Sequence, residues 1–355
     1  MRIKFEPELD FDDVLLLPQR STIESRKDIQ LEREFFFFHS PRKWVGLPLM
    51  SANMTSISGF QLARALQEYK IITCLHKYFT LDELIEGFKS CYIDYVWPSI
   101  GYSDQDLDKL IQFTNITGIE PNICIDVPSS YFEKFIKFCA KVRSYFPQSI
   151  IMAGNCCSSD LTQELILNGL VDISKIQIGP GSACLTRLVS GVGRGSLSCV
   201  FDCSHSAHGL KSSERHLGLV CSDGGCKNSG DVSKALAGGA DWVMLGKMFS
   251  GVDENSDVCE WIEENGEKKM IYYGMSTHMA QEKFGSGKND YRASEGSILK
   301  IPYKGPVKNV VQEILGGIRS CCAFLGSHSV KDMNKCADFR VINKIHQNNN
   351  PKYGD

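Results

Sequence analysis

The sequence predicts a (β/α)8 TIM barrel, in which eight parallel strands alternate with helices around a closed ring. Eight short apolar runs recur over residues 45–245, and most are separated by a stretch with helical periodicity. The runs are continuously apolar rather than alternating, which is typical of strands buried on both faces of a parallel sheet. An open, doubly wound sheet is the competing interpretation, but it commonly has fewer strands and a dinucleotide-binding motif after the first.

The elements follow one another as a barrel requires. The expected strands are Val45–Met50, Ile71–Leu75, Tyr95–Ile100, Asn122–Val127, Ile150–Ala153, Ile173–Ile178, Leu217–Cys221 and Asp241–Leu245. The expected helices are Phe60–Tyr69, Leu81–Phe88, Asp104–Phe113, Tyr131–Tyr145, Leu161–Asn168, Ser198–Gly209 and Gly230–Ala237. At 355 residues the chain has the length of one such barrel, and we expect a single catalytic domain over residues 1–355.

The segment after the eighth strand is long and polar. Residues 250–297 are rich in Glu, Lys, Gly and Ser, and they include an expected hairpin with Glu263–Glu267 as its turn and Lys269–Tyr273 as its returning strand. Long connections of this kind in barrels are often lids, so we predict a mobile lid over about residues 252–297. Gly305–Leu325 then predicts a closing helix that ends at Gly326, and Phe35–Phe38 predicts a core or subunit-contact strand.

Composition excludes several classes of partner. A formal net charge of −3 provides no field that would hold a long nucleic acid or an anionic membrane. No apolar run reaches the length of a membrane span, and Met1–Pro18 is too acidic for a secretory signal. The fifteen cysteines are scattered without a C-x-x-C pair, which favours free thiols in a reducing cytoplasm. A metal site built from Cys199, Cys203 and the histidines nearby is disfavoured by their positions around a helix.

A glycine-rich loop holds the best candidate for a nucleophile. The stretch GPGSACLTR, Gly179–Arg187, follows the expected strand Ile173–Ile178. Its glycines and proline forbid a helix and leave backbone amides free to face a ligand. Cys184 lies within this loop close to Arg187, and an adjacent positive charge stabilises a thiolate. A buried structural cysteine is the alternative interpretation.

Small or polar residues follow nearly every expected strand, and in a barrel they would share one rim. That rim is where barrel enzymes keep their chemistry, and the loops after strands seven and eight often bind phosphate there. Asp223–Gly225 and Gly246 occupy these two positions. Amides that cradle a phosphate make charge-assisted hydrogen bonds worth about 1.5–3 kcal/mol each. Turn glycines without a ligand are the alternative, but two such loops on adjacent strands favour the phosphate site.

Several longer motifs resemble one known family. They are LDFDDVLLLPQRST at Leu9–Thr22, the cysteine loop, SDGGC after strand seven, LG-x-MF after strand eight, YRASEG at Tyr291–Gly296 and ILGGIRS at Ile314–Ser320. Together these motifs resemble the GMP reductases of the IMP dehydrogenase/GMP reductase family, and the match covers nearly the whole chain. IMP dehydrogenases usually carry an inserted regulatory domain after the second strand, for which this chain has no room. Arg187 is also the reductase form, since the dehydrogenases usually have Gln there.

The resemblance implies an activity in purine salvage. Members of the reductase branch convert GMP and NADPH to IMP, ammonia and NADP⁺. By resemblance, Cys184 would attack C2 of the guanine and form a covalent thioimidate, while Thr186 and Glu295 would relay protons. Two alternatives remain open, namely IMP dehydrogenase activity with IMP and NAD⁺, and a catalytically weak protein that senses purine nucleotides.

Matching positions imply the binding residues. Those that would line the GMP site are Ser182, Asp223, Gly224, Gly225, Gly246, Lys247, Gly274, Met275, Ser276, Arg292, Ala293, Ser294 and Gly296. Those that would meet NADPH are Ser25, Arg26, Lys77, Asp126, Val127, Pro128, Met275, Tyr291, Arg292, Ser320, Cys321, Cys322 and Ala323, the last four from a neighbouring subunit of a homotetramer. A monovalent cation, K⁺, would be held by Gly179, Gly181, Cys184 and Arg187.

The chain departs from the family pattern at five places. Thr55 replaces the aspartate of ANMDT, and residues 128–130 replace the ANG of DVANGY. Arg194 stands where the family has the tyrosine of GVGYP, and Lys247 replaces the second glycine of LGGMF. A charged insertion of about six residues, Lys211–His216, precedes strand seven. Because the chain keeps all three residues of the proposed chemistry, we expect an active, divergent reductase.

Overall fold

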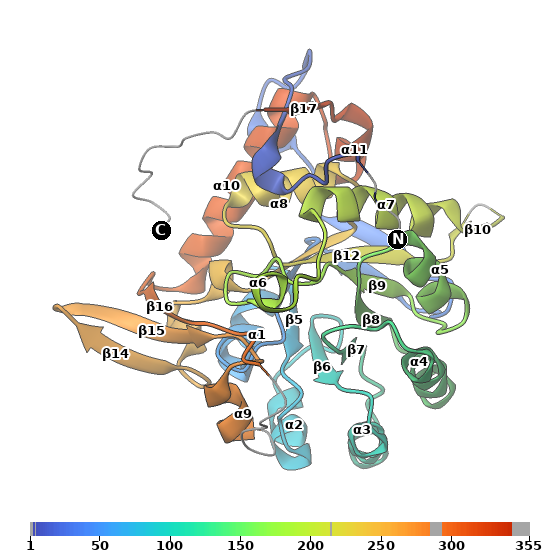
Figure 1. Ribbon diagram of the computed structural model, residues 1–355, viewed down its shortest axis with the longest axis vertical. Coiled ribbons are helices and arrows are strands. Elements are labelled where there is room, and N and C mark those ends of the chain that lie inside the picture. The colour runs from blue at the N-terminus through green and yellow to red at the C-terminus, as the bar shows by residue number, and fades with distance from the viewer. Residues whose placement is uncertain (1–2, 4, 214, 285–292, 343–355) are drawn as a thin grey trace.

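The protein is a closed barrel of eight parallel strands, which confirms the predicted fold class. The computed structural model describes residues 3, 5–213, 215–284 and 293–342. The ring closes in the order β12-β13-β4-β5-β6-β7-β8-β9, with helices packed around it (Figure 1). The barrel strands are β4 (Leu49–Ser51), β5 (Ile72–Leu75), β6 (Val96–Ile100), β7 (Ile123–Asp126), β8 (Ile151–Cys156), β9 (Ile173–Ile176), β12 (Leu219–Asp223) and β13 (Trp242–Leu245).

The helices alternate with these strands as predicted. They are α1 (Phe60–Gln67), α2 (Leu81–Phe88), α3 (Asp104–Thr117), α4 (Glu133–Tyr145), α5 (Ser159–Leu167), α7 (Ser196–Gly209), α8 (Ser229–Ala237) and the closing helix α10 (Val307–Leu325). Local sequence sets several ends. Thr80 and Glu83 form a capping box at the start of α2, and Gly326 ends α10 in the left-handed conformation with φ 67°.

The first expected strand, Val45–Met50, is in fact two elements. Its first half belongs to β3 (Lys43–Gly46), which pairs antiparallel with β2 (Arg33–Phe36), and only its end belongs to the barrel strand β4. Pro48 lies between the two and has no N–H to donate to a neighbouring strand, so the run cannot continue as one strand.

The β2–β3 hairpin closes the end of the barrel at which the strands begin. Phe35 and Phe37 are each 4% exposed and belong to the core cluster that fills the barrel. The Phe35 ring stacks on Trp242, the first residue of β13, with a centroid distance of 3.8 Å. Phe36 and Phe38, in contrast, are exposed. The expected core strand is therefore confirmed for alternate residues of this segment.

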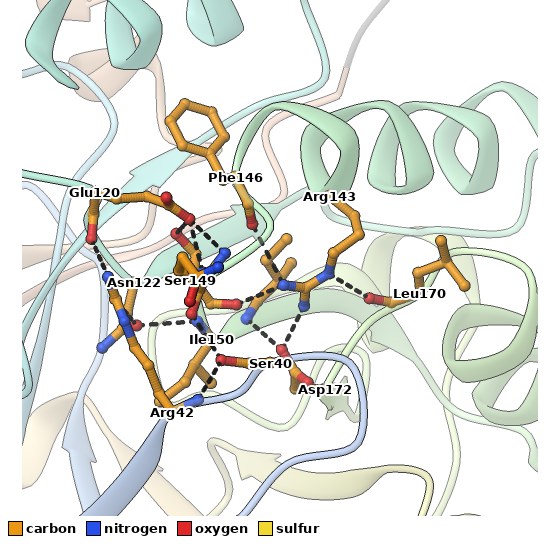
Figure 2. Close-up of polar contacts among 12 residues, drawn as sticks. Ser40, Arg42, Glu120, Asn122, Arg143, Phe146, Ser149, Ile150, Leu170 and Asp172 are labelled. Atoms are coloured by element: carbon orange, nitrogen blue, oxygen red, sulfur yellow. Dashed lines mark hydrogen bonds and ion pairs between the residues drawn. The ribbon is translucent and has the colours of Figure 1, made fainter. Parts of the chain in front are cut away.

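A polar network also cross-links the loops that precede the strands (Figure 2). The Arg143 guanidinium donates to Asp172 at 2.5 Å, and the same carboxylate oxygen accepts the Ile151 backbone amide at 2.8 Å. Arg42 donates to the Asn122 side chain at 2.6 Å. Because barrel enzymes use the opposite end for chemistry, these contacts serve stability.

The segment after β13 forms a small antiparallel sheet and a helix. β14 (Glu260–Glu264) and β15 (Glu267–Tyr273) make the expected hairpin, and β16 (Ile298–Pro302), which the sequence did not predict, adds a third strand. This sheet extends from the barrel at the lower left of Figure 1. Helix α9 (His278–Phe284) follows β15, and its Phe284 ring stacks on Tyr78 at 4.9 Å. That this segment is a mobile lid stays a prediction, and residues 285–292 lie outside the described part of the chain.

The remaining segments pair a strand from the first part of the chain with one from the last part. β1 (Val14–Leu16) pairs antiparallel with β17 (Phe339–Val341), and α10 packs against α8 (Figure 1). The charged insertion forms a hairpin of two short strands, β10 (Lys211–Ser212) and β11 (Arg215–His216). No helix among the described residues is long and apolar enough to cross a membrane.

Candidate active site

The cysteine loop lies at the carboxyl end of β9 and is held by two neighbouring segments. Gly179 takes a left-handed conformation with φ 82°, and the Cys184 amide donates to the Gly181 carbonyl at 2.9 Å. Residues 293–297 run antiparallel to this loop. The Leu185 amide donates to the Glu295 carbonyl at 2.6 Å, and Ser297 donates to the Ala183 carbonyl at 2.9 Å. This pairing brings the side chain of Glu295 to the cysteine loop from more than a hundred residues away.

The three residues of the predicted chemistry form a continuous hydrogen-bonded line. The Cys184 thiol donates to Thr186 Oγ1 at 3.2 Å, and the Thr186 hydroxyl donates to Glu295 Oε2 at 2.6 Å. All three side chains are half-buried, so a ligand in the barrel mouth could still reach the sulfur. A proton can pass along this line from the thiol to the carboxylate, which is how a general base activates a nucleophile.

The end of β15 approaches the same loop closely. A Cβ at Gly274 would lie 2.7 Å from the Ala183 carbonyl, which is closer than any larger residue allows. The Ser294 hydroxyl donates to the Ser276 carbonyl at 3.4 Å. The predicted GMP residues Gly274, Met275, Ser276, Ser294 and Gly296 thus lie together beside Cys184, and Ala293 is exposed at the edge. Tyr291 and Arg292 lie outside the described residues.

The two predicted phosphate loops follow neighbouring strands of the barrel, β12 and β13. Gly224 and Gly225 are both left-handed, with φ 87° and 81°, and both pack against Pro180 of the cysteine loop. Gly246 approaches Tyr272, since a Cβ there would lie 2.9 Å from the tyrosine oxygen. Lys247 is not among the described residues with positive φ, so lysine replaces the family's glycine without backbone strain.

A buried lysine joins the two halves of the barrel mouth. The Lys175 ammonium lies 2.7 Å from Asp126 and 2.7 Å from Asp223, and its side chain is 3% exposed. Burial acts to lower the pKa of Lys175, but the two carboxylates raise it well above its usual value. Burial likewise acts to raise the pKa of Asp126, yet Lys175 and then Lys77 hold it below its usual value. The Asp126 carboxylate therefore stays ionised in the site.

Sequence reasoning assigned no role to Lys175 or to two further residues of the mouth. The Asn155 side-chain amide donates to Asp223 Oδ2 and to the Gln177 carbonyl, both at 2.8 Å. Tyr272 is 3% exposed and interacts with Ser182, Asp223 and Cys184, and its burial raises the pKa of the phenol. A lysine inside the apolar run 173–178 was the available signal for Lys175, because lysine is almost never fully buried unless it is paired.

The remaining predicted cofactor residues form two groups. Asp126 and Val127 are partly or fully buried at the mouth with Lys77 nearby, and Pro128 is exposed beside them. The second group, Ser25, Arg26 and residues 320–323, gathers on α10 and the adjoining turn instead, where Arg26 donates to the Ser320 hydroxyl at 3.0 Å. Within it, Ser320, Cys321 and Ala323 are partly exposed, whereas Cys322 is fully buried and its burial raises the pKa of the thiol to about 12.

The predicted cation residues lie on one tight turn. Carbonyl oxygens are uncharged, hard donors of the kind that coordinate K⁺ in proteins. The Arg187 guanidinium is engaged elsewhere, with Asp10 at 3.2 Å and the Ser196 hydroxyl at 3.3 Å. It also has no acceptor atom, so only the backbone carbonyl of Arg187 could serve a cation together with those of Gly179, Gly181 and Cys184.

Comparison with known proteins finds one family. The family model described as IMP dehydrogenase / GMP reductase domain matches residues 95–350. A protein named GMP reductase from Shigella flexneri serotype 5b (strain 8401) is 43% identical over 355 residues, which cover 98% of this chain and 100% of that protein. Another of the same name from Escherichia coli O81 (strain ED1a) is 43% identical over 342 residues, or 96% of each chain.

Proposed function

Because the chain belongs to the IMP dehydrogenase/GMP reductase family, we propose that it is a GMP reductase, an NADPH-dependent oxidoreductase that converts GMP to IMP and ammonia in purine salvage. The observation that carries the proposal is the line from the Cys184 thiol through Thr186 to Glu295 at the barrel mouth. Reductive deamination needs a nucleophile and a way to deliver protons to a departing amine, and this line supplies both.

The residues perform the chemistry in two stages. The Cys184 sulfur forms a bond to C2 of the guanine, and its proton passes to Thr186 and Glu295. The same line returns a proton to the 2-amino group, which leaves as ammonia, so that a thioimidate remains on Cys184. NADPH, when bound, supplies the hydride for C2. The carbon–sulfur bond then breaks, IMP forms and the thiolate is restored.

The loops of the barrel mouth would hold the substrate. The amides of Gly224, Gly225 and Gly246 and the ammonium of Lys247 suit the 5′-phosphate, since glycine loops after strands seven and eight bind phosphate in this fold. Asp223, oriented by Lys175 and Asn155, suits the ribose hydroxyls. The base would then lie beside Cys184, against residues 274–276 and 293–296.

The cofactor site would need two chains. Lys77, Asp126, Val127 and Pro128 suit the nicotinamide end, with Met275, Tyr291 and Arg292 from the expected lid. The Arg26–Ser320 group offers a cation and hydroxyls for the phosphates of NADPH, and its place on α10 supports donation to a neighbouring subunit of a homotetramer. A K⁺ ion on the carbonyls of residues 179, 181, 184 and 187 would stiffen the cysteine loop.

The test is the loss of NADPH absorbance when GMP is added, with an IMP plus NAD⁺ reaction run in parallel. We expect GMP-dependent oxidation of NADPH that disappears in Cys184→Ala, while GMP binding measured by calorimetry persists. Cys336→Ala, which removes another partly exposed thiol, is the matched control and should keep full activity. If NADH forms from IMP and NAD⁺ while GMP causes no oxidation of NADPH, the activity is that of a dehydrogenase instead. If neither reaction proceeds but GMP still binds, the result would favour a nucleotide sensor.

A further inference from the structure

The N-terminal segment lies across the base of the cysteine loop. Residues 8–10, which we call the strap, pair with the start of α7. The Leu9 amide donates to the Ser198 hydroxyl at 2.9 Å, and the Leu9 carbonyl accepts the amides of Leu197 and Ser198 at 2.9 and 3.2 Å. A Cβ at Gly195 would lie 2.7 Å from the Leu9 backbone, so this close approach requires glycine. The strap is therefore a fixed part of the wall next to the cysteine loop.

Arg194 ties the strap to two other elements. Its guanidinium contacts the Glu8 carboxylate, with a shortest distance of 2.7 Å, and Asp202 of α7, also at 2.7 Å. It further donates to the Cys157 carbonyl, one residue after the end of β8, at 3.1 Å. The Arg194 side chain is 21% exposed, whereas the side chains of Glu8 and Asp202 are 41% and 49% exposed, so the guanidinium is the shielded member of each pair. The tyrosine that the family motif has at this position could not make these contacts together.

Arg187 carries the connection from Arg194 to the site. Its guanidinium donates to the Arg194 carbonyl and pairs with Asp10 of the strap at 3.2 Å. Its stem passes between two glycines, since Cβ atoms at Gly179 and Gly193 would each lie 2.8 Å from Arg187 Cγ. Arg187 and Thr186 are neighbours in the short helix α6 (Thr186–Ser190), so the position of one constrains the other.

We propose that Arg194 is a positioning residue for the active site. By clamping the strap, α7 and the end of β8 around Arg187, it fixes α6, and with it the Thr186 hydroxyl between the thiol and Glu295. Arg194 touches no reacting atom. The proposal rests on the proposed function where it concerns turnover, but not where it concerns the environment of the Cys184 thiol.

The test compares Arg194→Met and Arg194→Lys with Arg340→Met, which removes an arginine from an ion pair with Asp338 on the surface. Turnover is measured as kcat and as KM for GMP. The alkylation rate of each cysteine by iodoacetamide is measured without substrates by peptide mass spectrometry, and thermal unfolding monitors the fold. Glu8→Gln and Asp202→Asn weaken the same clamp while keeping the arginine.

We expect Arg194→Met to lower kcat about tenfold with KM for GMP changed less than about twofold, because misplaced catalytic groups act on the chemical step. The alkylation rate of Cys184 should change by about threefold or more, with Cys336 unchanged as an internal reference. Arg194→Lys should recover part of the loss in kcat and part of the change in Cys184 alkylation. Glu8→Gln and Asp202→Asn should change both quantities in the same direction as Arg194→Met, but less. Arg340→Met should match the wild type.

Two results would overturn the proposal that Arg194 positions the active site. One is a folded Arg194→Met protein with unchanged kcat and unchanged Cys184 alkylation. The other is a uniform rise in the alkylation of all cysteines, which would indicate general loosening of the fold rather than positioning. If the wild type does not oxidise NADPH with GMP, the proposed function fails, but the Cys184 alkylation rates still decide whether Arg194 positions the loop.

Discussion

Lys175 is the residue on which the charge of the barrel mouth depends. It faces two carboxylates at 2.7 Å each, and one belongs to the expected cofactor side while the other belongs to the expected substrate side. Removing or displacing the Lys175 ammonium would therefore change the surroundings of both carboxylates. Lys175 therefore couples the two halves of the site, and its own pKa, raised well above the usual value, keeps it charged throughout the working range.

Replacing this lysine should destabilise the protein in a pH-dependent way. Lys175→Met leaves Asp126 and Asp223 without their cation, and we expect the free energy of unfolding at neutral pH to fall by about 2–3 kcal/mol. This is below the range for a fully buried pair, because both carboxylates keep some contact with solvent. Lys175→Arg should recover most of the loss. Urea unfolding of the wild type and of both variants measures these changes in the free energy of unfolding.

The sign of the pH dependence follows from Asp126. Its pKa in the folded state is depressed, so its contribution to stability is present above its ordinary value of 3.8 and is lost as the pH falls through the depressed value. The difference between the wild type and Lys175→Met should therefore shrink in acid. A difference that is constant from neutral pH to about pH 3 would contradict the assignment.

Among single residues, the sequence predicted those whose role can be recognised from their immediate neighbours in the chain. Cys184 lies in a glycine loop close to a cation and could be found from the residues themselves. The roles of Thr186 and Glu295 entered only through a resemblance, and the pairing of Glu295 with Leu185 is formed by folding. Asn155 and Tyr272 carry no local mark of a role, because Asn155 acts through its contact with Asp223 and Tyr272 through its burial beside Ser182.

Among the elements, the β2–β3 hairpin contributes most to the closed end of the barrel. Phe35→Ala should lower the free energy of unfolding by about 3–5 kcal/mol, because the ring is buried against Trp242 and its removal leaves a cavity. Phe36→Ala, one residue away on the exposed face, should cost less than about 1 kcal/mol. Denaturant unfolding of both variants measures the difference. Equal losses in the free energy of unfolding would show that the hairpin does not close the barrel through Phe35.

Element prediction succeeded where burial is uniform and failed where pairing is distant. All eight barrel strands overlap the predicted runs, because strands buried on both faces are apolar throughout. The split at Pro48 was missed because the apolar composition continues across it. Strand β16 was missed because Ile298–Pro302 is short and ends in proline, and it becomes a strand only by pairing with β15.

An ion pair beside the insertion hairpin should make part of the stability depend on pH. The Asp241 carboxylate raises the pKa of His208, whose ring lies 2.8 Å from it, while burial and then Arg33 and Lys211 oppose that shift. His216 of β11 contacts the His208 carbonyl at 2.9 Å and so joins the hairpin to this pair. A histidine with a raised pKa contributes stability below its ordinary value of 6.5, and this is lost as the pH rises through the raised value.

His208→Gln should therefore lower the free energy of unfolding by about 1–2 kcal/mol near pH 6, where the charged pair is intact. The loss should be smaller near pH 9, since the wild-type imidazole is then neutral. Thermal unfolding at both pH values measures this, and His205→Gln, an exposed neighbour on α7, serves as the control. A larger loss at the higher pH would reverse the assigned sign.

On the scale of the whole molecule, the barrel separates stability from chemistry. One end is closed by the hairpin and the network of Figure 2, and the other holds the cysteine loop and the predicted phosphate loops. The Arg26–Ser320 group is built from α10 and the adjoining turn at residues 25–28 rather than from a loop that follows a barrel strand. We expect a cofactor that uses both this group and the mouth to bind between two copies of the chain, and this can be tested by complementation.

Mixed assemblies of two variants can show whether Arg26 serves its own chain or a neighbouring one. We expect Cys184→Ala to be inactive and Arg26→Ala to have a raised KM for NADPH. If Arg26 serves a neighbouring subunit, co-expressed chains carrying one change each form some sites with both residues intact, because Cys184 then comes from one chain and Arg26 from the next. Random assembly of equal amounts makes about one quarter of the sites complete. NADPH oxidation at low NADPH, in hetero-oligomers purified through two different tags, measures the recovery.

The matched control pairs Cys184→Ala with Glu295→Gln. Both residues belong to one mouth, where Thr186 joins them, so no site in that mixture can be complete and no recovery is expected. Recovery with Arg26→Ala but not with Glu295→Gln would assign the α10 group to the adjacent subunit. Absence of recovery in both mixtures would mean that Arg26 acts within its own chain. The NADPH site would then have to be completed by residues of that same chain.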